Sequence, residues 1–104
     1  MKSVIARSSQ KLPSKKKVGD LLRLYETGQY LPAEKSARSL VRRFPNFQFG
    51  WKVLAALLGL LGKNTEAVKA HQRAIELAPR DAEAHYNLGI TLSEIGYLDK
   101  ARES

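Results

Sequence analysis

Cysteine is absent from this chain, which excludes disulfide bonds, thiolate metal sites and cysteine nucleophiles. Long apolar runs are also missing. The uncharged, mostly apolar stretch between Lys52 and Lys63 contains only ten residues. A membrane-spanning helix needs about 20 consecutive apolar residues. We therefore predict that this stretch is a buried helix within a globular domain.

Residues suited to catalysis or metal binding are scarce. The two histidines, His71 and His85, lack further metal ligands at a workable spacing. We predict that His71 is a core residue and that His85 packs between helices. The chain has no phosphate-binding glycine loop and no serine nucleophile elbow. Glu76, Asp81 and Glu83 are predicted to form a solvated corner. We expect no enzyme, and no catalytic, cofactor-binding or metal-binding residue.

Acidic residues are missing before Asp20, whereas residues 1–17 contain six Lys or Arg. The formal net charge is +8, so most of the excess charge lies at the N-terminal end. This segment has too few apolar residues for a secretory signal, whose apolar region spans about 7 to 15 residues. We predict a flexible basic tail over residues 1–13 and a cytoplasmic protein, with an organelle transit peptide as the alternative for the tail.

An internal repeat of 34 residues organises the rest of the chain. The residues that recur at this spacing are Gly28, Gly62 and Gly96; Ala33, Ala67 and Ala101; Leu24, Leu58 and Leu92; and Pro45 and Pro79. At the same spacing Trp51 matches His85, and Lys17 matches Trp51. The repeat predicts a repeat domain over 14–104 with units at 14–47, 48–81 and 82–104, the last of them truncated.

Each unit is predicted to form two helices, because apolar residues recur at helical spacing and no run alternates as a half-buried strand would. The predicted helices cover 15–27, 31–43, 50–61, a segment capped by Asn64 or Thr65 that stops at Pro79, and 82–96, followed by a partial sixth helix. Ser14 and Asp81 are predicted N-caps. Glycine is expected to end the first helix of each unit. The small residues Ala55, Ala56 and Gly59 are expected to let neighbouring backbones approach closely.

The repeated residues resemble the tetratricopeptide repeat. The residues that carry the resemblance are Trp51, Leu54, Ala55, Leu58, Gly62, Ala67, Ala74 and Pro79 in the second unit, and Leu88, Gly89, Leu92, Gly96 and Ala101 in the third. The resemblance implies an all-α fold, a right-handed superhelix of stacked helix-turn-helix repeats with two full units and a partial third. Lys17 stands where the second unit has Trp51, so looser packing is expected at that edge. The resemblance also suggests the N-terminal repeats of a longer bacterial protein.

In proteins of this kind, the first helices of successive units line a concave groove. The resemblance therefore implies a protein-protein interaction scaffold that binds a peptide or a partner helix there. The residues placed in this groove are Phe49, Lys52, Ala56, Leu60, Glu83, Tyr86, Asn87, Ile90 and Glu94. Some relatives use an asparagine at the position of Asn87 to hold a peptide backbone, and a structural role for Asn87 fits equally well. Nothing in the sequence identifies the partner.

Two other functions are weighed against the scaffold. The stretch FGWKVLAALLGLLGK resembles bacterial repeat proteins that continue into sulfotransferase or glycosyltransferase domains, which implies a tethering or acceptor-positioning module. Binding of nucleic acid or an anionic partner is suggested by the basic tail and by Lys35, Arg38, Arg42 and Arg43. No aromatic residues interleave with these cations as in a base-stacking platform, so nucleic acid is disfavoured. The uncapped last helix suggests either a homo-oligomer or further repeats after Ser104. No membrane partner is expected.

Overall fold

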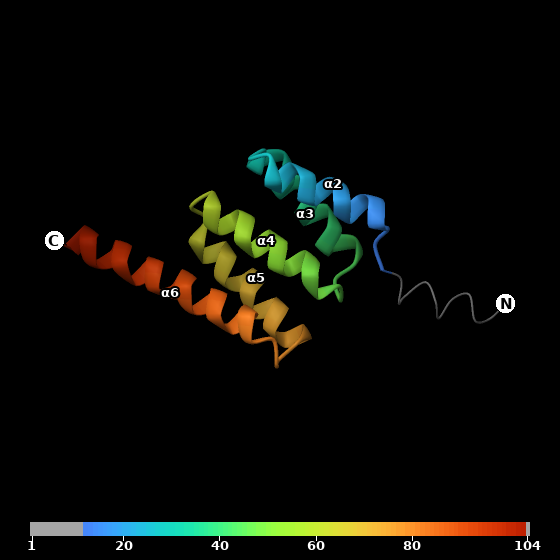
Figure 1. Cartoon of the computed structure of the whole chain (residues 1–104). Coiled ribbons are helices and arrows are strands. Elements are labelled where there is room, and N and C mark those ends of the chain that lie inside the picture. Colours follow the sequence, from blue (N-terminus) through green and yellow to red (C-terminus); the bar gives the residue numbers. More distant parts are fainter. Residues whose placement is uncertain (1–11, 104) are drawn as a thin grey trace.

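The computed structural model describes residues 12–103, which form five helices and no strand. The helices are α2 (Lys15–Glu26), α3 (Tyr30–Arg43), α4 (Gln48–Leu60), α5 (Asn64–Leu77) and α6 (Ala82–Glu103). Each helix packs against the next one along the chain, so α4 lies between α3 and α5 (Figure 1). The predicted fold class is confirmed: α2–α3 and α4–α5 are helix-turn-helix pairs, and α6 begins a third. Most of the predicted basic tail, residues 1–11, lies outside the described residues.

The helix ends follow the predicted signals in most places. The Ser14 side chain accepts a hydrogen bond from the Lys17 backbone N–H at 3.1 Å and so caps α2. Asp81 caps α6 in the same way, because its carboxylate accepts from the Ala84 backbone N–H at 3.2 Å. Gly28 and Gly62 have φ angles of 77° and 79°, a backbone conformation that residues other than glycine rarely adopt.

Two predicted helix ends are wrong. The N-cap of α5 is Lys63 rather than Asn64 or Thr65, and it makes no side-chain capping bond. Helix α6 continues past Gly96 to Glu103, so the described residues contain no sixth helix. A turn at Gly96 would break backbone hydrogen bonds that a continuing helix keeps.

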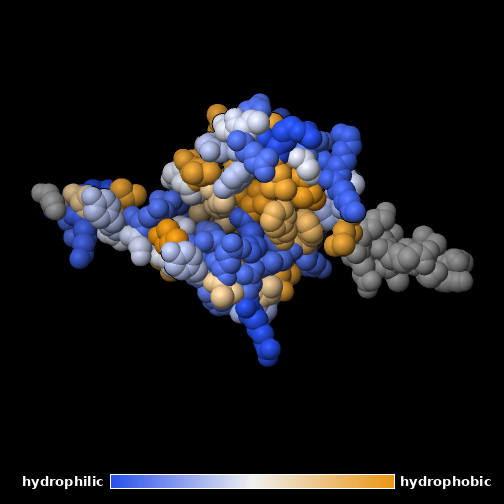
Figure 2. Space-filling model, in the orientation of Figure 1, coloured by the Kyte–Doolittle hydropathy of each residue, from blue (hydrophilic) through white to orange (hydrophobic). Residues whose placement is uncertain are grey.

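The uncharged stretch is the centre of the core, as predicted. Leu54, Leu57 and Leu58 of α4 are all buried, and Leu58 is only 1% exposed. Trp51 is half-buried and packs against the same cluster. No helix among residues 12–103 is long and apolar enough to cross a membrane. Figure 2 shows that apolar residues are also exposed over the region of α3 and α4, with more hydrophilic residues on either side.

The glycine that marks a tight contact in this core is Gly50 rather than the predicted Gly59. A Cβ placed on Gly59 would have no atom within 4 Å, so Gly59 does not mark a tight contact. A Cβ on Gly50 would lie 3.3 Å from Val41 Cγ1 and 3.4 Å from Leu40 Cδ2. Gly50 therefore lets the start of α4 approach the end of α3.

The 34-residue repeat extends to polar contacts. The Trp51 indole Nε1–H donates to the Pro45 carbonyl at 2.8 Å, and the His85 Nε2 lies 2.8 Å from the Pro79 carbonyl. Both contacts tie a first helix to the proline that precedes it. His85 is exposed, however, so its predicted packing role is wrong, and only its polar role matches that of Trp51.

A buried carboxylate joins the two second helices. Glu34 of α3 is paired with Arg38 at 2.7 Å and with Lys63 at 3.1 Å, and Arg38 also contacts Glu66 of α5 at 2.7 Å. Burial alone would raise the pKa of Glu34, but its hydrogen bonds to Arg38 and Lys63 outweigh that effect and lower it. Arg38 is thus engaged within the fold, whereas the sequence suggested that it binds an anionic partner together with Lys35, Arg42 and Arg43.

Candidate functional site

A hollow of about 380 Å³ opens where the first helices of the three units meet, and we call it the central hollow. Its walls come from α2, α4 and α6, with α5 at its base. The residues that line it are Tyr25, Ala55, Ala56, Gly59, Leu60, His71, Asn87, Ile90, Thr91 and Glu94. This arrangement follows from the repeat, because equivalent helices present equivalent faces to the same side of a stack.

The structure brings five of the nine predicted groove residues together in the central hollow: Ala56, Leu60, Asn87, Ile90 and Glu94. Leu60 and Ile90 are exposed although they are large and apolar. The Asn87 side chain is half-buried, and its amide has no hydrogen-bond partner among residues 12–103. An apolar surface beside an unpartnered amide is a typical feature of ligand sites.

Phe49 and Tyr86 are exposed and lie outside the central hollow. The Phe49 ring packs edge-on against Phe47 with 6.2 Å between ring centroids. Tyr86 is 69% exposed and lies beside a shallower depression on α6 that it shares with Ile90 and Glu94. These two aromatic residues therefore flank the site rather than line it.

Lys52 and Glu83 form part of a structural cluster, so the prediction that both face a ligand finds no support in their contacts. The Lys52 ammonium contacts Asp81 at 2.9 Å and also Glu83. Asp81 accepts a further bond from the Gln48 amide at 2.9 Å. The predicted solvated corner is thus partly wrong, because Asp81 joins the start of α4 to the start of α6. The hydrogen bonds from Gln48 and then from Lys52 hold the pKa of Asp81 well below its ordinary value of 3.8.

The lowered pKa of Asp81 predicts an acid-dependent loss of stability. A carboxyl whose pKa is lower in the folded chain stabilises it above the unfolded pKa, and that contribution is lost as the pH falls through the folded pKa. Asp81→Asn keeps a capping side chain but removes the charge. We expect urea unfolding to show a less stable variant at pH 7 and a difference that shrinks below the ordinary value of 3.8. Asp99→Asn, on an exposed pair with Arg102, is the control and should change stability little at either pH. A gap for Asp81→Asn that is independent of pH would contradict the assignment.

Five residues of the central hollow were not predicted from the sequence as groove residues: Tyr25, Ala55, Gly59, His71 and Thr91. Tyr25 is held by an edge-on contact with Tyr30, with 6.1 Å between ring centroids. His71 was predicted to be a core residue, and it is buried with its Nε2 3.1 Å from Thr91 Oγ1. Burial lowers the pKa of His71, which favours the neutral imidazole near pH 7. The repeat gave no signal for Tyr25, His71 and Thr91 because none of these three residues recurs at the 34-residue spacing.

The charge of the central hollow is slightly negative. Glu94 is the one acidic residue in its lining, and no Lys or Arg lines it. Lys52, the predicted groove cation, is occupied by Asp81 and Glu83. Among residues 12–103, no group of three or more His, Asp or Glu side chains could hold a metal ion. The chemistry available here is therefore apolar contact, amide hydrogen bonding and attraction of positive charge.

Comparison with known proteins finds a family match over helices that line the central hollow. Residues 60–96 match the family model described as TPR repeat. The peroxisomal targeting signal receptor of Saccharomyces cerevisiae is 35% identical over 63 residues, which are 61% of this chain and 10% of that receptor. The receptors of the same name from Candida glabrata and Kluyveromyces lactis are 36% identical over 59 residues and 37% identical over 60 residues. These matches cover 57% and 58% of this chain, and 10% and 11% of the respective receptors.

The chain thus spans about a tenth of the length of the curated relatives that it matches. The matched residues 60–96 include the whole of α5 and the part of α6 that lines the central hollow. This stretch of the helical stack is therefore similar to a tetratricopeptide repeat, both in sequence and in its helix-turn-helix fold.

Proposed function

We propose that the chain is a protein-interaction scaffold that holds an extended peptide or a partner helix in the central hollow. One observation carries the proposal: α2, α4 and α6 converge on one hollow that contains the unpartnered amide of Asn87. A side-chain amide offers both a donor and an acceptor, so it can bond to the backbone of any peptide unit. Such a contact selects for a peptide without selecting its sequence.

The comparisons support the same class of function. The relatives from three yeasts are named as receptors for a targeting signal, and the match to them is limited to part of each receptor. A stack of helical repeats presents an extended concave surface, which suits the binding of another chain. We propose that this chain uses its repeat surface to bind a polypeptide.

The lining of the central hollow predicts which peptides fit. Leu60 and Ile90 offer exposed apolar surface, so an apolar side chain of the ligand gains by burial there. Glu94 favours a basic residue of the ligand nearby, and the lack of a lining cation disfavours a carboxylate. We therefore propose a peptide that combines an apolar residue with a basic one.

The test is a selection of displayed random peptides on the purified chain, followed by measurement of Kd by fluorescence anisotropy. A peptide ending in Ser-Lys-Leu, a peroxisomal signal, is included as a defined probe. We expect the selected peptides to be enriched in apolar and basic residues. Asn87→Ala should weaken binding roughly fivefold to tenfold, the effect of losing one hydrogen bond of about 1 to 1.5 kcal/mol.

A matched pair of variants on α6 locates the binding surface. Ile90 lines the central hollow, whereas Leu92 is exposed on the same helix and does not line it. Ile90→Asp should abolish measurable binding, and Leu92→Asp should leave Kd within about twofold. The opposite result, loss with Leu92→Asp alone, would place the partner on the outer face of α6 and refute the proposal.

Other inferences from the sequence stay predictions. Exposed apolar residues on α6, among them Leu92, Tyr97 and Leu98, support the predicted homo-oligomer without showing it. The same holds for a bacterial source, a cytoplasmic location, the unit boundaries and the place of this chain at the start of a longer protein. A transferase tether is also untested.

A further inference from the structure

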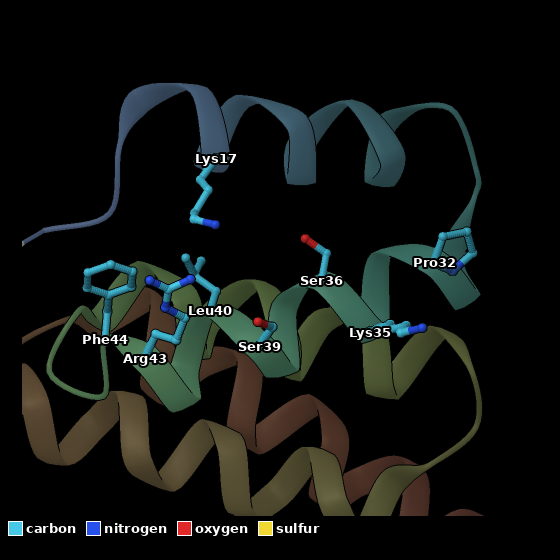
Figure 3. Close-up of a pocket in the computed structure, with 8 residues that line it drawn as sticks. All are labelled: Lys17, Pro32, Lys35, Ser36, Ser39, Leu40, Arg43 and Phe44. Carbon is cyan, nitrogen blue, oxygen red and sulfur yellow. The ribbon is translucent and has the colours of Figure 1, made fainter.

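A second hollow, of about 300 Å³, lies between α2 and α3, and we call it the basic hollow. Figure 3 shows Lys17 reaching from α2 toward α3, where Arg43 lies beside Leu40. Ser36 points from α3 toward α2, and Ser39 lies one turn closer to Arg43. Lys35 lines the other end of the hollow.

The repeat explains why this hollow exists. In the second unit, the Trp51 indole fills the corresponding place, with the Arg73 guanidinium 6.0 Å from its ring centroid. The residues 34 positions earlier are Lys17 and Ser39, which are slimmer and leave the space open. The predicted looser packing at this edge thus takes the form of a hollow lined by polar groups.

Further differences between the first and second units add basic and hydroxyl groups to the hollow. Arg43 stands 34 positions before Leu77, and Ser36 stands 34 positions before Ala70. Apolar residues of the second unit are therefore replaced by hydrogen-bond donors in the first. Within residues 12–103, Lys17, Lys35 and Arg43 make no ion pair, whereas Arg38, Lys52 and Lys63 elsewhere in the stack all do.

Cations that share a hollow without an acid repel one another, and a bound anion removes that repulsion. Ser36 and Ser39 add hydroxyl donors, and neither hydroxyl has a hydrogen-bond partner among the described residues. The Arg43 guanidinium offers parallel N–H groups that match two oxygens of a phosphate, and Lys17 can supply a point charge from the facing helix.

We infer that the basic hollow binds the phosphate group of a small soluble molecule. The hollow is recessed between two helices, which suits a small ligand better than a flat membrane surface. Leu40 and Phe44 line it beside the cations, so the ligand can carry an apolar part next to its phosphate. This site is distinct from the central hollow, and it does not depend on peptide binding there.

The experiment is a titration of the ¹⁵N-labelled chain with pyrophosphate at constant ionic strength, followed by NMR. Constant ionic strength separates a site from general screening of surface charge. We expect saturable shifts confined to the amides of α2 and α3 around the basic hollow. Arg43→Gln should weaken binding at least about tenfold, the usual effect of losing a charged hydrogen-bond partner.

Arg42→Gln is the matched control, because Arg42 carries the same charge on the same helix but does not line the hollow. It should change the affinity about twofold or less. A filling variant, Lys17→Trp with Ser39→Arg, rebuilds the packing of the second unit and should abolish the shifts while circular dichroism shows an intact helical fold. Equal effects of the two arginine variants, shifts spread over the whole surface, or binding only to vesicles of phosphatidic acid would overturn the inference.

Discussion

Leu58→Ala is expected to destabilise the folded chain by about 2 to 5 kcal/mol. Leu58 is 1% exposed and lies on α4, between the two neighbouring helices of the stack. Truncation removes apolar contacts and leaves a cavity that surrounding side chains fill only in part. A chain of this size has a total stability of only about 5 to 15 kcal/mol, so the variant should unfold at much lower denaturant concentration.

The repeat supplies a control for this variant. Leu92 occupies the same repeat position, 34 residues later, but it is 50% exposed on α6. Leu92→Ala should change the free energy of unfolding by about 0.5 kcal/mol or less. Urea unfolding followed by circular dichroism measures both variants. Equal losses for Leu58→Ala and Leu92→Ala would show that α4 is no more enclosed than α6.

Ala67→Leu is expected to cost about 1 to 3 kcal/mol through overpacking. Ala67 has no exposed surface and lies in the main apolar cluster at the start of α5. A leucine there has no free volume to enter, so α5 must shift away from its neighbours. The effect is opposite in origin to that of Leu58→Ala, since one change leaves a cavity and the other adds atoms to a filled site.

Ala101→Leu is the matched control, because Ala101 shares the repeat position with Ala67 and is exposed near the end of α6. It should leave the midpoint of thermal unfolding nearly unchanged. If Ala67→Leu stabilised the chain, or if both variants destabilised it equally, the packing of α5 against the core described above would be wrong.

Helices α2 to α5 could be predicted from the sequence because local signals and the repeat agree there. Ser14 caps α2 as its local signal predicts, and Gly28 and Gly62 end helices at positions that the 34-residue spacing relates. At Gly96 the local signal is the same, but the described residues provide no second helix to cover the turn, and α6 continues. A glycine permits a turn without enforcing one, so packing decides the outcome.

The central hollow was predictable only in part. Five of its α4 and α6 residues, namely Ala56, Leu60, Asn87, Ile90 and Glu94, were predicted because the first helices share one face. Tyr25 and His71 reach it through tertiary packing, which the sequence pattern does not encode. The engagement of Lys52 could not be predicted, because the sequence gives no measure of its distance to Asp81, which follows it by 29 positions and lies 2.9 Å away. The basic hollow follows from the sequence only when Lys17 and Ser39 are compared with the packed pair Trp51 and Arg73.

Amide hydrogen exchange of the free chain tests the stacked arrangement most directly, since protection depends on how well each helix is enclosed. We predict the slowest exchange in α4 around Leu54 to Leu58, and fast exchange in α6 after Gly96. Uniform protection along α6, or exchange in α4 as fast as in the last turns of α6, would contradict the account.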